Sequence, residues 1–569
     1  MTAEIVAKTR RTSLVTTFGI GSLLPAQDDS VMICGLDEWP KGEVITEPRL
    51  ARSLGVAEFR SPRTWGKSRG DVPAVRFPEW AFCTDCRRLG PFWDITDPGT
   101  RRCDRCNGMV SPSRFVSCCT NGHIEDFPYR AWVHEDASVP HEGHSLKMVA
   151  RGHTSALSDL VVECSCGRSR SMAGAFDLAA LRGVKRCSGS RPWLSSNDAS
   201  CDKELRTLQR GSSNVWFAVQ RSAISIPSVP SIADTFIAKR MPDANPDASA
   251  EDLARSFRPP EGCTTEDLVR AIHRWRNPAA SEAAPSDREL RAEEYTALVR
   301  GKGAVESSDQ FLCEEIDLVD SGVPEIIAQV SRVSRLREVR ALTGFTRVLP
   351  STDDNKDDVA VAPLSDSKHP VWLPAMEVLG EGVFLRLDER LLEKWVETEF
   401  AQSRTKLLMR SQAAVGGNSL TSGLDVSPRV LALHSLAHVL VDEMSLTSGY
   451  PAASLRERVY DADGQAGILV YTATADSAGS LGGLAALSDK DRFHTTLANG
   501  IRRARWCTAD PVCVESTGSG VNGMNLAACH ACLLLPETSC ERFNLTLDRA
   551  SLIGLPDKPT LGLFGGLFS

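Results

Sequence analysis

Cysteine clustering constrains the fold of this chain more than any other feature of its sequence. The chain holds 18 cysteines in 569 residues, and only Cys34, Cys263 and Cys313 lie outside two blocks that run from residue 83 to 201 and from 507 to 540. In a reducing compartment disulfides are unusual, and clustered thiols more commonly bind metal. The pattern therefore predicts that bound metal ions hold parts of the fold together.

Length and composition indicate a folded protein of several domains. A chain of 569 residues exceeds the size at which one hydrophobic core stops growing. Its net charge of -8 argues against polyanion binding over the whole surface but leaves room for a local basic groove. The sequence contains no run of about 18 to 20 apolar residues that could span a membrane, and the N-terminal apolar run lacks a cleavage pattern. We therefore expect a cytoplasmic protein.

The pattern along the chain predicts an α+β multidomain fold. We expect a zinc-stapled, loop-rich N-terminal half and a C-terminal mixed α/β domain closed by a cysteine cluster. The expected segments are a strand-and-turn region, a zinc-binding region with two cysteine clusters, a helical middle region ending in a linker, and the C-terminal domain, at residues 1–75, 76–230, 231–370 and 371–569.

Individual elements can also be predicted. Residues 324–345 show helix-like spacing that ends at Gly344, and the acidic stretch 351–370 is typical of an exposed linker between two halves. A long apolar helix should follow Ser427 and end near Gly449. Residues 466–474, rich in β-branched and aromatic side chains, predict a buried strand.

The clearest local motif is a pair of Cys-x-x-Cys turns. Cys83 and Cys86 form the first, and Cys103 and Cys106 follow after sixteen intervening residues. Two such turns present four thiolates to one tetrahedral Zn²⁺. Four free thiols or a redox pair are the alternatives, and nothing nearby is typical of a thioredoxin-like unit. We predict a zinc site here.

A second group offers more ligands than one zinc can take. Our preferred quartet is Cys164, Cys166, Cys187 and Cys201, although Cys164 and Cys166 are one residue closer than a Cys-x-x-Cys pair. The substitutes are Cys119 and His123, beside Cys118, and the alternative is a set of buried thiols.

A third zinc is predicted near the end of the chain. Cys529 and Cys532 form a knuckle, and Cys507 and Cys513 lie upstream of it. Cys540 is a fifth candidate for the four positions. We expect these zincs to be architectural, because a structural zinc contributes folding free energy.

The sequence "HSLAH" places His434 and His438 on one helical face, with Asp442 one turn further along. Zinc metalloproteases use this i, i+4 spacing, but Ser435 stands where their general-base glutamate would be. A metal-dependent hydrolase or nuclease is therefore the alternative function, against histidines that only hydrogen-bond inside a packed helix.

Two basic stretches are candidates for DNA contact. Arginines beside an aromatic ring can contact phosphates and stack on a base, although arginine-rich faces are usually only solvated. The candidates are Arg332, Arg335, Arg502, Arg503 and Trp506. The paired glycines of "FGIGSLLP" and "AGSLGGL" do not continue into a P-loop, so ATP hydrolysis by this chain is not expected.

The motifs together resemble a known family. "LHSLAHVLVDEMSLTSGY", "CTADPVC" and "AACHACLLLPETSCERFNLTLDR" resemble the zinc-binding cysteine domain that accompanies some superfamily-two DNA helicases. With "TTFGIGSLLP", "VSCCTNGHIEDFPYRAWVH" and "LREVRALTGF", nearly the whole chain is similar to the DrmB family, a core component of the bacterial DISARM anti-phage systems.

This resemblance implies a non-catalytic, zinc-binding subunit. Members of the family assemble with a DrmA-type helicase that hydrolyses ATP, and the complex engages DNA, including single-stranded ends. The resemblance leaves the choice of zinc ligands among the cysteines open.

Overall fold

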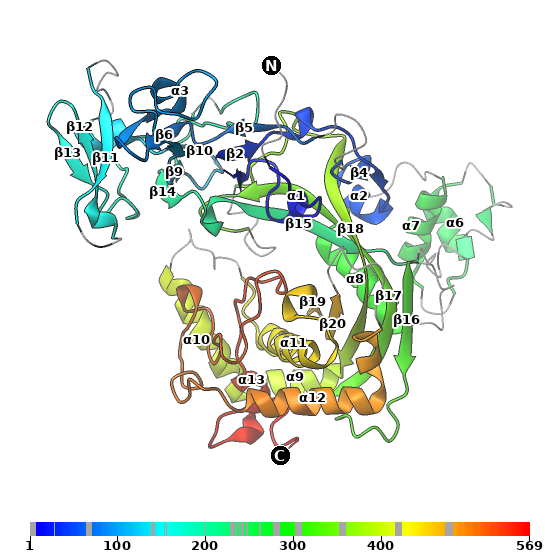
Figure 1. Ribbon diagram of the computed structural model, residues 1–569. Coiled ribbons are helices and arrows are strands. Elements are labelled where there is room, and N and C mark those ends of the chain that lie inside the picture. Colours follow the sequence, from blue (N-terminus) through cyan, green and yellow to red (C-terminus); the bar gives the residue numbers. More distant parts are fainter. Residues whose placement is uncertain are drawn as a thin grey trace.

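The computed structural model describes residues 7–568 with gaps, and every structural statement below concerns these residues. The gaps are at residues 28, 64–70, 137, 139–142, 153, 155, 199, 228–232, 234–235, 238–239, 242–243, 246–247, 261–262, 277–284, 302–309, 352–359, 416–423 and 473–481. Helices and several separate sheets alternate along the chain (Figure 1), which confirms the mixed α+β class. No helix in the described part of the chain is both long enough and apolar enough to cross a membrane.

Three small antiparallel sheets build the N-terminal half. The strands are short and the connections long, as expected for a region rich in Gly, Pro and Cys. The first sheet has the order β1 (Leu23–Pro25), β2 (Ser30–Ile33), β5 (Ala74–Arg76); the second β10 (Ile124–Asp126), β9 (Phe115–Cys118), β14 (Arg206–Gln209); the third β13 (Ser169–Ser171), β12 (Leu160–Cys164), β11 (Leu146–Ala150), β7 (Arg88–Pro91), β6 (Trp80–Cys83), β8 (Val110–Pro112). Short helices α1 (Ser13–Thr16), α2 (Pro48–Leu54), α3 (Phe92–Ile95) and α4 (Tyr129–His134) connect them.

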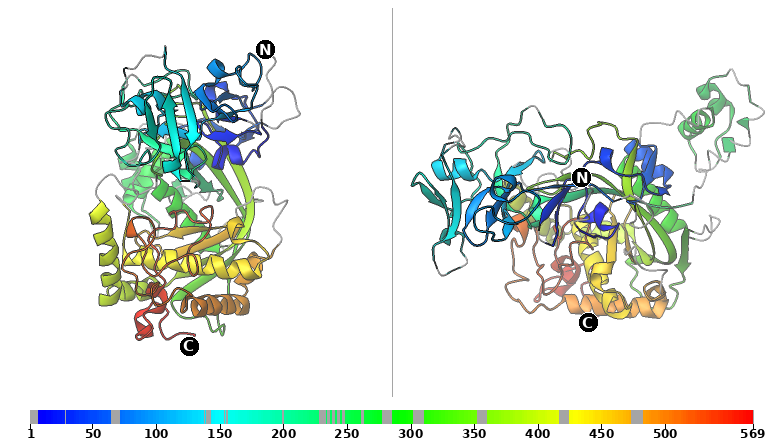
Figure 2. Two further views of the ribbon diagram at one scale, coloured as in Figure 1. Left: turned by 60° about the vertical axis from the view of Figure 1, so that its left-hand side comes forward. Right: turned by 45° about the horizontal axis from the view of Figure 1, so that its top comes forward.

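An eight-stranded sheet runs through the centre of the molecule. Two long strands, β17 (Ile327–Thr346) and β18 (Trp372–Leu387), pair antiparallel along most of their length. The other strands are β15 (Phe217–Ile224), β16 (Phe311–Ile316), β19 (Leu455–Tyr460) and β20 (Gly467–Thr472), with β3 (Val44–Ile45) and β4 (Glu58–Arg60) at one edge. Figure 2 shows the long strands passing from the N-terminal half into the C-terminal half.

The helix predicted over 324–345 is wrong, because this segment is strand β17. It pairs with β15 and β16 on one side and with β18 on the other. Register shifts between Val333 and Leu336 interrupt the alternation of the strand, so its apolar residues recur at spacings that resemble a helix. Central position in the sheet, rather than local propensity, decided the structure.

Helices cover both faces of the central sheet. On one face, α9 (Glu389–Val396), α10 (Glu399–Val415), α11 (Pro428–Thr447), α12 (Lys490–Ala504) and α13 (Ala550–Ile553) enclose the largest apolar core. On the other face, α8 (Asp287–Arg300) packs on a smaller core. A peripheral pair, α6 (Ala250–Ser256) and α7 (Thr265–Arg276), extends to the side (Figure 1).

Two local predictions are confirmed in the C-terminal half. Helix α11 begins after Ser427, whose hydroxyl accepts a hydrogen bond from the backbone N–H of Val430, as a serine cap should. The buried strand predicted over 466–474 is β20 (Gly467–Thr472), in which all residues are buried, while residues 473 and 474 lie outside the described residues. Almost every residue of α11 is also buried, because the helix lies between the sheet and α12.

The expected linker connects paired strands. Residues 351–370 join β17 to β18, and 352–359 lie outside the described residues. Ala362 pairs with Phe345, and Leu364 packs in the N-terminal core. β17 contributes Val330 to the C-terminal core and Leu342 to the N-terminal one. The two halves thus share one sheet, and the four segment boundaries stay a prediction.

Candidate metal centres

Five groups of ligand-type side chains converge in the structure. Each group has four residues whose Cys Sγ, His nitrogen or carboxylate oxygen atoms lie within 4.8 Å of one another. Four ligand atoms around one zinc at 2.0–2.3 Å are separated by about 3.3–3.8 Å, so these spacings suit tetrahedral coordination. All 18 cysteines are thiols that form no disulfide.

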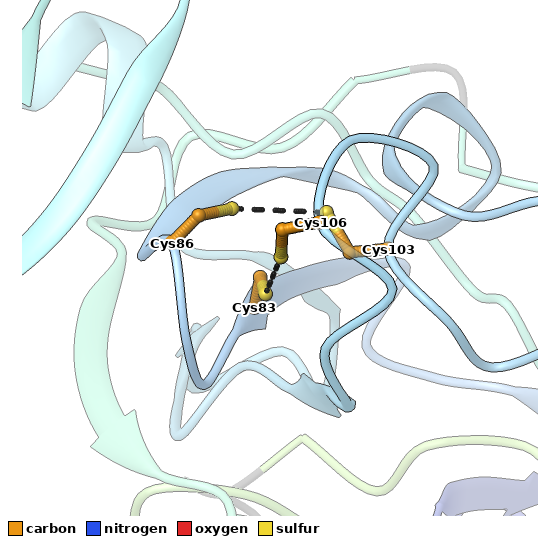
Figure 3. Close-up of side chains that lie close together, drawn as sticks. All are labelled: Cys83, Cys86, Cys103 and Cys106. Carbon is orange, nitrogen blue, oxygen red and sulfur yellow. Dashed lines mark hydrogen bonds between the residues drawn. The ribbon is translucent and has the colours of Figure 1, made fainter.

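The first group is the double Cys-x-x-Cys motif. Cys83 ends β6, and the turn to β7 carries Cys86, while Cys103 and Cys106 lie on a second turn (Figure 3). The Sγ atoms of Cys83 and Cys106 are 3.4 Å apart, and those of Cys86 and Cys103 are 3.7 Å apart. Burial raises the pKa of Cys83 to about 12. The backbone N–H of Gly108 and the neighbouring Cys83 lower the pKa of the exposed Cys106 to about 7, which favours its thiolate.

The second group differs from the quartet that we expected. Cys187 and Cys201 meet Cys119 and His123, and not Cys164 and Cys166. His123 Nδ1 lies 3.4 Å from Cys119 Sγ and 3.5 Å from Cys187 Sγ. The reason is topological: strand β9 and the turn to β10 bring residues 119–123 to this place, whereas Cys164 ends β12, which belongs to another sheet.

An outer carboxylate orients the histidine of the second group. His123 Nε2 lies 2.6 Å from Asp198 Oδ2, which also accepts from Arg191. A histidine that ligates metal through one nitrogen commonly donates its other N–H to a carboxylate. Nδ1 is thereby left as the atom that faces the thiols.

The third group combines Cys164 and Cys166 with two histidines that the sequence analysis did not select. His134 at the end of α4 places Nε2 3.4 Å from Cys166 Sγ, and His144 places Nδ1 3.3 Å from Cys164 Sγ. Two hydrogen bonds lower the pKa of Cys166 to about 6, the larger effect coming from the backbone N–H of Arg168 and the smaller from the His134 side chain. The sequence signal that could have identified this site is the pair His134 and His144, which precedes the Cys-x-Cys motif in the chain.

The fourth group settles which of the five C-terminal cysteines lie together. Cys507 and Cys529 are separated by 3.4 Å between their Sγ atoms, and Cys513 and Cys532 by 3.7 Å. Cys540 does not join them and belongs to a fifth group. Cys507 follows α12, so this helix and the loop 505–533 close the site.

The fifth group contains both histidines of "HSLAH". His434 and His438 meet Glu457 and Cys540, and all four side chains are buried. Asp442, which we considered as their third ligand, instead forms an ion pair with Arg503, whose Nη2 lies 2.6 Å from Asp442 Oδ2. Glu457 was not predicted, because β19 brings it to α11 only through tertiary packing.

The arginines proposed for DNA contact do not form one surface. Arg332 lies on β17 and pairs with Asp489, just before the start of α12. Arg502 and Arg503 lie at the opposite end of that 15-residue helix, about 22 Å away, beside the exposed Trp506. Arg335 is exposed on β17. Ion pairs with acidic groups already occupy Arg332 and Arg503.

A large cleft lies between the N-terminal segments and the C-terminal half. Its volume is about 950 Å³, and its walls come from α1, β15, α8, β19 and residues 537–543. Seven arginines and three acidic residues line it, together with the aromatic rings of Phe18, Trp216, Phe217 and Phe543. Among the described residues, the buried atoms Arg210 Nη1 and Arg456 Nε find no hydrogen-bond partner.

Comparison with known proteins gives one relative that matches nearly the whole chain and two domain families that match parts of it. The chain is 30% identical to the DISARM protein DrmB of Bacillus paralicheniformis over 568 positions, which cover 95% of this chain and 99% of the relative. The chain belongs to the DrmB family. Residues 10–217 match a domain of unknown function, DUF8724, and residues 436–533 match the MrfA Zn-binding domain.

The two matched regions of this DrmB-family chain contain four of the five groups completely. The first three groups fall within residues 10–217, and the fourth falls within the zinc-binding domain. The fifth group extends beyond that domain, because His434 precedes residue 436 and Cys540 follows residue 533. Metal binding, with zinc as the expected ion, is thus supported for the C-terminal domain.

Proposed function

We propose that this DrmB-family chain is a zinc-binding, non-catalytic subunit of an anti-phage defence complex in the cytoplasm. In this proposal it docks on a DrmA-type helicase, which hydrolyses ATP, and contributes a DNA-binding surface to the complex. Similarity to a DISARM protein over nearly the whole of both chains is the observation that carries the proposal. Clustered thiols without disulfides are consistent with a reducing compartment.

The large cleft is the surface that suits DNA best. Arginine side chains attract phosphates, and aromatic rings beside them can stack on unpaired bases. Several of the arginines are held by carboxylates, as in the pairs Arg458–Glu294 and Arg291–Glu541. Arg210 and Arg456 line the cleft and form no ion pair with a described carboxylate, so they are the best candidates for phosphate contacts.

The surface at the C-terminal end of α12 is the second candidate. Trp506 is 69% exposed there, next to Arg502, and an exposed tryptophan beside a cation is a typical platform for a base. Ion pairing of Arg503 with Asp442 and Glu443 weakens this candidate.

Measurements of DNA affinity in variants of each surface can show which of the two surfaces binds DNA. We would measure the affinity for a single-stranded oligonucleotide at several salt concentrations in Arg210→Ala/Arg456→Ala, in Arg502→Ala/Trp506→Ala, and in a control, Arg182→Ala, whose partner Glu204 lies on the exposed surface. Each lost phosphate contact should flatten the plot of log affinity against log salt by about 0.7, so the cleft variant should lose about 1.4. Equal slopes in all variants would rule out both surfaces.

Complex formation is tested separately. The purified chain and the DrmA-type helicase should elute together from a size-exclusion column at micromolar concentration. Two separate peaks would contradict a stable complex, whatever the DNA measurements show.

The alternative, a metal-dependent hydrolase at His434 and His438, predicts DNA cleavage by the isolated chain. A catalytic zinc needs an open coordination position for water, and both histidines are fully buried. DNA cleavage by the wild type that disappears in His434→Ala would favour the hydrolase.

A further inference from the structure

The buried group of His434, His438, Glu457 and Cys540 has a geometry that hydrogen bonding alone does not explain. His434 Nε2 lies 3.0 Å from Glu457 Oε1 and 3.2 Å from Cys540 Sγ. His438 Nε2 lies 3.4 Å from the same Glu457 oxygen. Four groups that can donate an electron pair therefore converge on one small volume.

The proton on His438 can be assigned from its partner. Its Nδ1 lies 2.9 Å from the backbone carbonyl oxygen of Leu533. A carbonyl oxygen can only accept, so Nδ1 carries the proton and Nε2 of the neutral ring presents a lone pair. Within the described structure, three buried atoms of this group have no hydrogen-bond partner, namely His434 Nδ1, His438 Nε2 and Glu457 Oε2. An unpartnered buried atom needs an explanation, and a bound cation would supply one for the lone pair of His438 Nε2.

The sulfur of Cys540 accepts two backbone hydrogen bonds. The backbone N–H groups of Arg542 and Asn544 both donate to it at 3.3 Å. Backbone donors stabilise negative charge on sulfur, and a thiolate is the form that binds metal. Cys540 lies beside the carboxylate of Glu457, so two acidic groups meet in a fully buried place.

We propose that this group binds a divalent metal ion, for which zinc is the best match. One thiolate, one carboxylate and two imidazoles are ligands that zinc accepts, and four of them fill a tetrahedral shell. The charges also balance, because one dication neutralises Glu457 and Cys540 while both histidines stay neutral. Burial of an ion site is far less unfavourable when its charges compensate one another. The hydrogen bond to Leu533 then orients His438 as an outer partner should.

The four side chains are almost completely buried, which favours a structural site over a catalytic one with an open position for water. The exposed fractions are 0% for His434 and His438, 1% for Glu457 and 4% for Cys540. The metal joins α11, β19 and the segment after the Cys529–Cys532 knuckle. Cys540 itself and its neighbours Glu537, Thr538, Glu541 and Phe543 line the cleft, so the metal would also fix one wall of the proposed DNA-binding surface.

Metal counting tests the proposal without reference to DNA. We would measure zinc by inductively coupled plasma mass spectrometry in the full-length wild type, in Cys540→Ala, and in Cys313→Ala, a buried cysteine outside all five groups. Cys540→Ala should hold one metal ion fewer than the wild type, and Cys313→Ala should hold the same number. Equal metal content in all three proteins would overturn the proposal.

A measurement on the unaltered chain covers the case in which Cys540→Ala does not fold. In crystals of the wild type, an anomalous difference map at the zinc edge should show a peak within about 2.3 Å of Cys540 Sγ and His438 Nε2. Peaks at the Cys-rich groups without a peak at this place would overturn the proposal equally. Either result is independent of whether the cleft binds DNA.

Discussion

Substitution of Asp198 by asparagine isolates the contribution of one outer carboxylate to metal binding. In the wild type, Asp198 Oδ2 lies 2.6 Å from His123 Nε2, and Nδ1 of the same ring faces Cys119 and Cys187. The carboxylate fixes the tautomer of the ring and makes Nδ1 more basic. Asparagine has nearly the same shape but no charge, so the geometry of the site should survive while its metal affinity falls.

The expected loss can be bounded from the structure. Loss of an outer partner of a metal-bound histidine typically lowers affinity 10- to 100-fold, which is about 1.4 to 2.7 kcal/mol. Asp198 is 37% exposed, so water can replace part of its hydrogen bonding. Arg191 also remains beside the new amide. We therefore expect a loss near the lower end, about tenfold.

A chromophoric chelator that competes for zinc measures this loss directly. In Asp198→Asn, one equivalent of metal should transfer at about tenfold lower chelator concentration, and the other equivalents should transfer as in the wild type. Asp252→Asn, which alters an exposed carboxylate on α6 outside the five groups, serves as the control. Superimposable curves for the wild type and Asp198→Asn would refute the assignment of His123 as a ligand.

Three further substitutions test other parts of the structure. Cys106→Ser should remove one metal equivalent by elemental analysis, whereas Cys263→Ser, outside the five groups, should remove none. Glu338→Gln breaks a buried ion pair and should reduce the free energy of unfolding by about 3–5 kcal/mol in urea titrations. Burial raises the pKa of Glu338, but the arginines around it hold that pKa well below its ordinary value of 4.5. The carboxylate therefore stabilises the fold fully above about pH 4.5, and this contribution is lost as the pH falls below that value. Glu338→Gln should not show this loss of stability at acid pH. Gly21→Ala should lower the melting temperature, because φ is +75° there and a Cβ atom would lie 2.5 Å from Phe345 Cζ.

Metal-binding motifs could be predicted from the sequence where their ligands lie close together in the chain. The pairs Cys83–Cys86 and Cys529–Cys532 each form one turn, and the structure places each pair with the partners that spacing suggested. The long helix after Ser427 was predictable because cap, length and apolar content agree in one segment. In these places the local sequence and the tertiary structure favour the same conformation.

Prediction failed where partners are distant in the sequence. Glu457 reaches His434 only because β19 packs beside α11, and nothing in the local sequence of β19 distinguishes a metal ligand from a surface carboxylate. The choice among seven ligand-type residues in the middle of the N-terminal half depended on which sheet carries each of them. The bulge in β17 likewise produced a helix-like spacing within a strand.

The metal groups have different structural roles in the two halves. In the N-terminal half, the first three groups lie at apolar clusters smaller than the main N-terminal core, so metal ions would add folding free energy where local apolar packing is limited. The C-terminal half already has the largest core of the chain. There the fourth and fifth groups fix residues 505–549, a long segment with almost no regular structure that lies between α12 and α13.

Irregular segments of this length are uncommon in compact domains unless they carry a function. The segment supplies all four ligands of the fourth group and Cys540 of the fifth. Between Cys532 and Asn544 it contributes Glu537, Thr538, Cys540, Glu541 and Phe543 to the cleft. Leu533, Leu535 and Leu547 of this segment pack in the C-terminal core, and the metal groups would add to this anchoring from the buried side. Metal ligation beneath the loop orders it from the buried side and leaves its outer face polar, and this is why we connect the fifth group with the proposed DNA-binding surface.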